Sequence, residues 1–242
     1  MRKAVIAALL AGAGVTAACG QARSQDPGPT VARSFPVGNF TEVEVAGPFD
    51  VDIRTGANPG VNARGNDELI EHLIVEVRGD KLEIRPRSER RWFGGWRGNS
   101  RGSGTISVTV PMIRAASLAG AGDLRINAVK GDDFEGEIAG SGDLRVDSVE
   151  VQSLKLGIAG SGGATARGRA RRAEYEIAGS GGVDAQGLEA EDLKVSIAGS
   201  GDIKARATKA ADVDIMGSGN VEVTGGARCS VSKAGSGNVR CS

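Results

Sequence analysis

The sequence predicts an all-β protein built as a parallel β-helix, a solenoid with coils of about 20 residues. Three observations predict this fold. A five-residue glycine box, Ala-Gly-Ser-Gly-Asp and its variants, occurs seven times at intervals of 18–20 residues. Apolar residues alternate with polar ones on both sides of the boxes, as they do in half-buried strands. The chain has 38 glycines in 242 residues, and their periodic placement indicates turns rather than disorder.

The first 18 residues are typical of an export signal peptide. Arg2 and Lys3 form a positive start, residues 4–15 form an apolar run, and small residues follow. The run is too short for a stable membrane-spanning helix, which needs about 20 apolar residues. The sequence therefore predicts a protein exported from the cytoplasm.

Two cleavage sites remain open. Thr16-Ala17-Ala18-Cys19 resembles a bacterial lipobox, in which Cys19 would carry the lipid, whereas Gly20-Gln21-Ala22 suits ordinary signal peptidase. The mature protein is thus expected in the periplasm, on the outer membrane as a lipoprotein, or at the cell surface. Residues 19–34 contain Pro27, Gly28 and Pro29 and predict a linker.

Residues 35–242 are expected to form one domain, and its first part, 35–110, is rich in strand patterns. Val43 and Val45, for example, alternate with polar neighbours. Between these patterns, Asn66 to Val77 predicts one short helix with Asn66 as its N-cap. We expect this helix to cap the N-terminal end of the solenoid, where open strand edges would otherwise invite strand addition.

Residues 111–242 carry the glycine boxes, which begin at Ala119, Ala139, Ala159, Ala178, Ala198, Met216 and Ala234. Apolar residues lie at matching positions around the boxes, so equivalent residues are expected to stack from coil to coil. Glycine suits a sharp corner because it adopts positive φ without a Cβ clash. The box serines are expected to form a ladder whose hydroxyls satisfy backbone groups at the corner.

These residues carry a family resemblance. The strand-rich start with Phe40 and Val43, the segment 66–73, the strand 106–111 and the Gly-Ser-Gly-Asp coils together resemble the bacterial DUF2807 family. That family is also called the putative auto-transporter adhesin, head GIN domain. The resemblance implies a right-handed, single-stranded parallel β-helix on exported bacterial proteins, with no established enzymatic activity.

Cys229 and Cys241 are predicted to form a disulfide. Cys19 is lipidated or removed under either cleavage, which leaves an even pair of cysteines in an oxidising compartment. The bond would enclose the last glycine box and pin the final coil. The alternative is two free thiols packed as small apolar groups.

The composition argues against several functions. Lys plus Arg and Asp plus Glu number 30 each, so no net field favours nucleic acid. One box carboxylate per coil is too few for the roughly 6–8 oxygen ligands of calcium, and no metal or cofactor is expected. Gly98 to Gly102 matches G-x-S-x-G, but no helix pattern follows and His72 is the only histidine. No catalytic site is predicted.

One segment is a candidate for binding. It contains both tryptophans of the chain among several arginines, a composition common in binding hot spots. The alternative is that the rings fold back to cover the solenoid. The candidate residues are Arg90, Arg91, Trp92, Phe93, Trp96 and Arg97.

These observations predict an exported envelope protein that acts as a non-catalytic structural or binding scaffold, like an adhesin head. Its partner would be an unidentified envelope or surface ligand, either glycan or protein. Contact with a membrane is expected only through the N-terminal lipid, and the solenoid sides leave oligomers open. The alternative is a β-helix polysaccharide-active enzyme, which would need carboxylates clustered on one coil face.

Overall fold

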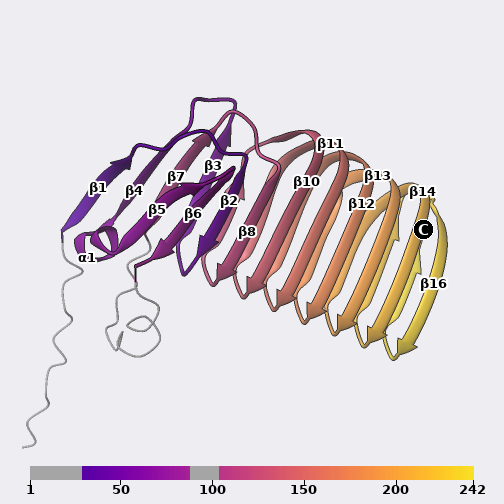
Figure 1. The fold of residues 1–242 in the computed structure, drawn as a ribbon. Helices are drawn as coiled ribbons and strands as arrows, with labels where there is room; N and C mark the ends of the chain where they lie inside the picture. Colours follow the sequence, from indigo (N-terminus) through magenta and orange to yellow (C-terminus); the bar gives the residue numbers. More distant parts are fainter. Residues whose placement is uncertain (1–28, 88–103) are drawn as a thin grey trace, which may run out of the picture.

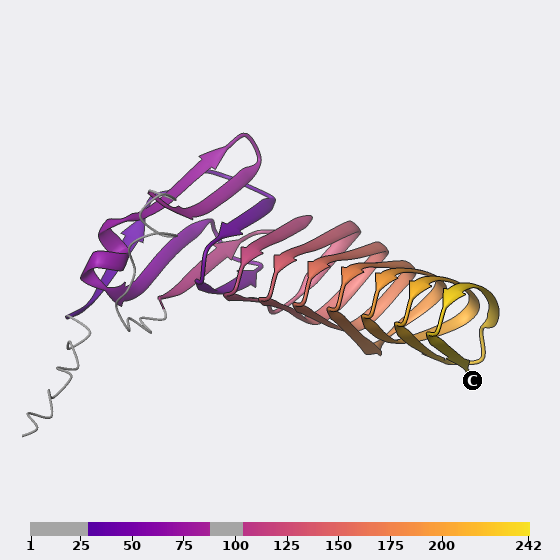
Figure 2. The ribbon, with the colours of Figure 1, turned by 90° about the horizontal axis from the view of Figure 1, so that it is seen from below.

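The computed structural model describes residues 29–87 and 104–242. Nearly all of them lie in strands, and the strands stack in parallel, coil on coil, along a rod (Figures 1 and 2). The predicted all-β solenoid is therefore confirmed. The elements are β1 Thr30–Phe35, β2 Glu42–Ala46, β3 Asp50–Thr55, β4 Gly60–Asn66, α1 Asp67–Glu71, β5 Leu73–Arg78, β6 Lys81–Pro86, β7 Thr105–Val110, β8 Ala115–Gly120, β9 Asp123–Ile126, β10 Val129–Gly140, β11 Asp143–Gly160, β12 Gly163–Gly179, β13 Gly182–Gly199, β14 Asp202–Gly217, β15 Asn220–Thr224, β16 Arg228–Gly235 and β17 Asn238–Cys241.

Equivalent residues stack from coil to coil, as the repeat predicts. Ile158 pairs with Ile177 and Gly160 with Gly179 in the parallel register of β11 and β12. Residues of β11 and β12 alternate between buried and outward positions, and the buried residues of the coils form one continuous apolar core. Because each coil buries its apolar side chains only against its neighbours, the stack is stable as a unit rather than coil by coil.

The first coils do not follow the order of the sequence. Strands β2 and β3 form a coil that pairs on one side with β6 and β7 and on the other with β8 and β9, all in parallel. The coil of β2 and β3 thus comes first in the sequence but second in the stack. The coil of β6 and β7, which follows it in the sequence, lies at the N-terminal end of the stack. The parallel stack thus extends N-terminal of residue 111.

Antiparallel strands close the N-terminal end of the rod. Strand β5 pairs with β6, β4 pairs with β7, and β1 pairs with β4. Helix α1 lies against β4 and β1 (Figure 1). These elements cover the strand edges that the first coil would otherwise expose. Strand β1 begins at Thr30, inside the range 19–34 expected to be a linker.

The predicted helix is shorter than expected. Asn66 caps it, since its side-chain oxygen accepts a 2.8 Å hydrogen bond from the N–H of Leu69, but the helix ends at Glu71. Residues from Leu73 onward form β5 instead. The β-branched run Ile74-Val75 favours a strand, and Gly79, with φ of 62°, turns the chain back into β6.

Candidate binding faces of the solenoid

The glycine boxes form a corner that repeats along the rod. In each of seven boxes the first glycine has positive φ, and at Gly160 the value is 135°. A Cβ on Gly160 would overlap the carbonyl oxygen of Gly140 in the coil before it. Stacked glycines thus let the corner backbones approach closely.

The box serines contribute to this corner through their backbone, which differs from the expected role of their hydroxyls. The N–H of Ser141 donates a 2.9 Å hydrogen bond to the carbonyl oxygen of Gly120, and Ser161, Ser180, Ser200 and Ser218 donate equivalent bonds. Within the described part of the chain, the hydroxyls of these serines make no hydrogen bond. The side chains are exposed along one edge of the rod.

The structure adds a box that the repeat pattern missed. Gly47 and Phe49 lie directly beneath Gly120 and Gly122, and the N–H of Gly47 donates a 2.8 Å hydrogen bond to the carbonyl of Ala119. The Gly-Ser-Gly letters are absent because Pro48 and the buried Phe49 replace two of them. The apolar residues on either side of this box could have revealed it. They have the same spacing from residues 46–50 as the equivalent residues have from the box at residues 119–123.

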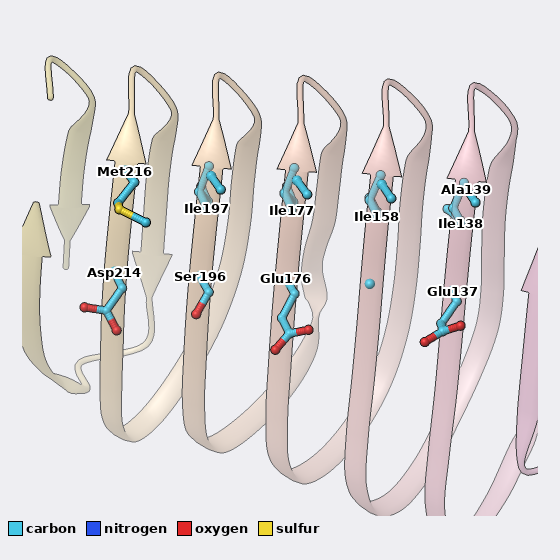
Figure 3. Close-up of a pocket in the computed structure, with 14 residues that line it drawn as sticks. Glu137, Ile138, Ala139, Ile158, Glu176, Ile177, Ser196, Ile197, Asp214 and Met216 are labelled. Carbon is cyan, nitrogen blue, oxygen red and sulfur yellow. The ribbon is translucent and has the colours of Figure 1, made fainter. Parts of the chain in front are cut away.

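The corner separates two outer faces. We call the outer surface of residues 135–140, 155–160, 174–179, 194–199 and 212–217 the pre-box face. It holds a shallow groove of about 550 Å³ that crosses five coils (Figure 3). The outward methyl groups of Ala139, Ala159, Ala178 and Ala198 line it, and Met216, with 68% of its surface exposed, lies at its C-terminal end.

Acidic side chains border this groove. Glu137, Glu176 and Asp214 lie in one row across the strands, with Ser196 between the last two (Figure 3). The row is thus acidic in every second coil, a spacing of about 10 Å if coils are about 4.8 Å apart. Glu137 and Asp214 form no ion pair with any residue in the described ranges.

The neighbouring row on the same face alternates in charge: it holds Glu135, Lys155, Glu174, Lys194 and Asp212. Lys155 lies 3.4 Å from Glu135 and 3.7 Å from Glu176, and Lys194 lies 2.7 Å from Glu174. Glu176, followed by Glu135, raises the pKa of Lys155 and keeps it charged. Among the described residues, Glu176 is thus the one member of the acidic row that forms an ion pair with a lysine of the next row.

The outer surface of residues 123–126, 143–146, 163–166, 182–185 and 202–205, the post-box face, has a second hollow of about 590 Å³. It lies where Gly163 and Gly182 replace the box aspartate. Asp143 accepts a 2.8 Å hydrogen bond from the N–H of Gly163, and Asp202 accepts one of 2.8 Å from the side chain of Asn220. These carboxylates thus hold adjacent coils together. Across residues 29–87 and 104–242, no group of three or more His, Cys, Asp or Glu is arranged to hold a metal ion.

The remaining predicted site residues have different outcomes. The structure joins Cys229 to Cys241 in a disulfide, with their Cα atoms 6.6 Å apart. The lipidation candidate Cys19, the Gly98–Gly102 motif and the binding-patch candidates Arg90, Arg91, Trp92, Phe93, Trp96 and Arg97 lie outside the described residues. No helix in the described ranges is long and apolar enough to cross a membrane.

The flanks of the Trp- and Arg-rich segment are described. The N–H of Arg87 donates a 2.7 Å hydrogen bond to the carbonyl of His72, and the carbonyl of Gly104 accepts one of 3.2 Å from Asp50. Arg87 follows β6 and Gly104 precedes β7, so in chain order the segment replaces the glycine box of its coil. The side chain of His72 is exposed.

Solved structures share this fold. A putative adhesin from Bacteroides fragilis superimposes with a TM-score of 0.80 at 22% identity, covering 88% of this chain and 97% of its own. A putative lipid binding protein from Parabacteroides distasonis gives 0.70 at 24%, covering 89% and 97%. A putative adhesin from Parabacteroides merdae gives 0.67 at 17%, also covering 89% and 97%. At these identities the likeness establishes the fold alone.

No curated protein sequence matches the chain. The model of one family does match, over residues 39–227, which include the coils from β2 to β15 and both candidate faces. The match starts before the first box and agrees with the resemblance seen in the glycine boxes. The chain therefore belongs to the DUF2807 family, described as putative auto-transporter adhesin, head GIN domain.

Proposed function

We propose that the protein is an exported, non-catalytic binding scaffold of the bacterial envelope, with the pre-box groove as its binding surface. The observation that carries the proposal is the groove itself: four stacked alanines form its floor across successive coils, and Glu137, Glu176 and Asp214 border it. A long, shallow surface of this kind suits an extended ligand better than a small one. The adhesin-like family and fold support the same function.

The ligand is an envelope glycan or a surface protein segment. Alanine methyls offer a flat apolar floor for a sugar ring or an aliphatic side chain, and the carboxylates can accept hydrogen bonds from hydroxyls or pair with cations. The repeated spacing of the acidic row favours a ligand that itself repeats along its length. The Trp- and Arg-rich segment remains a second candidate contact, to be tested by replacing Trp92 and Trp96 with alanine.

The alternative, a polysaccharide-active enzyme, would need a general acid whose pKa is raised by its surroundings. Two carboxylates outside the groove have pKa values shifted in the opposite direction. Hydrogen bonds from Arg145 and Arg125 lower the pKa of Asp147, and a hydrogen bond from Lys209 lowers that of Glu191. Both groups are thus held ionised by ion pairs that join coils.

The test uses two variants with the same chemical change. Ala178→Arg places a long side chain in the groove, whereas Ala210→Arg places it at an exposed position outside the groove. The protein is passed over immobilised peptidoglycan and envelope polysaccharides, and both retention and cleavage products are scored. We expect retention to fall at least about tenfold for Ala178→Arg and to stay unchanged for Ala210→Arg. Equal retention of both variants would exclude the groove, and cleaved glycan would support the polysaccharide-active alternative.

Location requires a separate experiment. The intact mass of the protein from membrane and soluble fractions distinguishes the two cleavage sites. A mass that begins at Cys19 with a diacyl or triacyl adduct would make the scaffold a membrane-tethered lipoprotein. A mass that begins at Arg23 would make it a free periplasmic or secreted binder, and a mass that includes residues 1–18 would contradict export.

A further inference from the structure

The pre-box face carries a net negative charge, although the whole chain is neutral. Six carboxylates and two ammonium groups lie at its outward positions, which gives a net charge of −4. A face of one sign attracts a partner of the opposite sign and repels others. The groove in this face is therefore complementary to a cation. The carboxylates are those of Glu135, Glu137, Glu174, Glu176, Asp212 and Asp214, and the ammonium groups are those of Lys155 and Lys194.

Two of the carboxylates that border the groove can accept a ligand cation. Lys155 lies 3.7 Å from Glu176, but no Lys or Arg of the described ranges lies within 4 Å of Glu137 or Asp214. Gly157 lies between Glu137 and Glu176, and a Cβ there would meet only the side chain of Glu137, at 3.9 Å. Space for a cation is thus open beside Glu137.

The spacing of the acidic row selects the conformation of the occupant. Glu137, Glu176 and Asp214 are two coils apart and so repeat about every 9.6 Å along the rod (Figure 3). A polyproline II helix has three residues per turn and rises about 3.1 Å per residue, so every third side chain points the same way, about 9.3 Å apart. Side chains on one face of a β-strand repeat at about 6.6 Å, which matches neither one coil nor two.

The alanine floor lies at the right distance from this row. Along each strand the alanine is two residues beyond the acidic position, about 6.6 Å away, as Ala178 is from Glu176. A peptide that rests on the methyl groups can therefore reach the carboxylates with the four-carbon stem of lysine or with arginine. Met216 takes the alanine position at the C-terminal end of the groove, and its exposed thioether adds an adaptable apolar contact.

We propose that the occupant of the pre-box groove is a cationic peptide segment in the polyproline II conformation, with lysine or arginine at every third position. The inference rests on the proposed function and specifies its ligand. The segment lies along the rod with its other side chains on the alanine floor. Its cations pair in turn with Glu137, Glu176 and Asp214, and about seven residues span this distance.

Two heptapeptides of the same composition test the spacing. One has lysine at its first, fourth and seventh positions and proline elsewhere, and the other has its three lysines together at one end. Fluorescence anisotropy of the labelled peptides, titrated with the protein, should give a Kd at least about fivefold lower for the spaced peptide. Equal Kd values for the two peptides would overturn the proposal.

Substitutions test the location. Glu137→Gln and Asp214→Asn should each raise the Kd of the spaced peptide about two- to fivefold, and the double variant should raise it about tenfold. Glu71→Gln makes the same kind of change at an exposed position of α1, at the N-terminal end of the rod, and should leave the Kd unchanged. Circular dichroism establishes that each variant is folded. A folded double variant that binds the spaced peptide as tightly as the wild type contradicts the proposed contacts.

The result is separable from that of the proposed function. Ala178→Arg blocks the floor of the groove and should abolish binding of the spaced peptide. If Ala178→Arg lowers retention on envelope glycans while the wild type binds neither peptide, the groove is a binding surface but its ligand is a glycan, and the cationic peptide is wrong. If the spaced peptide binds the wild type and Ala178→Arg equally, the peptide does not occupy the groove and the inference is also overturned.

Discussion

The backbone N–H of Ser161 donates a 2.9 Å hydrogen bond to the carbonyl oxygen of Gly140, one coil earlier. The bond can form because the stacked glycines at the corner carry no Cβ that would keep the two backbones apart. Gly160, which precedes Ser161, has φ of 135° and no room for a Cβ. Glycine therefore repeats in the sequence because the backbones of successive coils are in contact at the corner.

Gly160→Ala should destabilise the protein strongly. The substitution forces a side chain into positive φ and against the carbonyl of Gly140, and strain of this kind costs roughly 2–4 kcal/mol. Gly157→Ala, in the same strand, is the matched control. Its Cβ would meet only the side chain of Glu137 at 3.9 Å, so the change should stay within about 0.5 kcal/mol of wild type or stabilise slightly. Chemical denaturation of both variants measures the difference, and equal stabilities would contradict the role given to the corner.

The same corner explains how far the sequence predicted the fold. Where the box kept its letters, coil length, register and stacking followed from spacing alone, as in the pairing of Ile158 with Ile177. Where Phe49 replaced a glycine, the coil was missed, although Val43 and Val51 kept the spacing of later coils. The inserted order of the first two coils was not predictable, because parallel pairing between segments far apart leaves no local signal.

The candidate site was less predictable than the fold. Strand alternation places Ala139 outward, next to the buried Ile138. The sequence of one coil does not show, however, that the outward alanines of four coils form a common floor. Glu137 and Glu176 become neighbours in a row only once the register is fixed. The helix was predicted too long because Leu73 lies four residues after Leu69, the apolar spacing of a helix. The β-branched residues after Leu73 favour a strand instead.

Tyr175 should make the protein sensitive to high pH. Its ring is buried in the core at 1% exposure, and burial raises the pKa of its phenol. A raised native pKa means that stability is complete below the unfolded value of about 10 and is lost as pH rises above it. Tyr175→Phe should therefore match the wild type at pH 7 and exceed it above about pH 10. Because Tyr175 is the only tyrosine, phenolate absorbance follows this ionisation directly. Ionisation near pH 10 in the folded protein would refute the prediction.

Removing the disulfide should loosen one end of the rod. Cys229 and Cys241 are 12 residues apart, and a loop of this size contributes about 3 kcal/mol in the chain-entropy estimate. The double variant Cys229→Ala, Cys241→Ala should lose most of this and should exchange amide hydrogens faster in β16 and β17 than in β11 and β12. Hydrogen exchange with mass spectrometry resolves the two regions. Uniform acceleration along the rod would contradict a local role for the bond.

Asp147 should link stability to acid pH. It accepts hydrogen bonds from Arg145 at 2.7 Å and, from the coil before, from Arg125 at 2.9 Å, and these bonds lower its pKa. A lowered native pKa means that the stabilisation is present above the unfolded value of about 3.9 and is lost as pH falls through the native value. Asp147→Asn should therefore have a lower free energy of unfolding than the wild type at pH 7. The difference should be less than about 1 kcal/mol because the group is partly exposed, and it should disappear toward pH 2. Asp133→Asn, at an exposed position without an ion pair in the described ranges, is the control. A gap between Asp147→Asn and the wild type that is independent of pH would show that the hydrogen bonds, and not the charge, hold the two coils together.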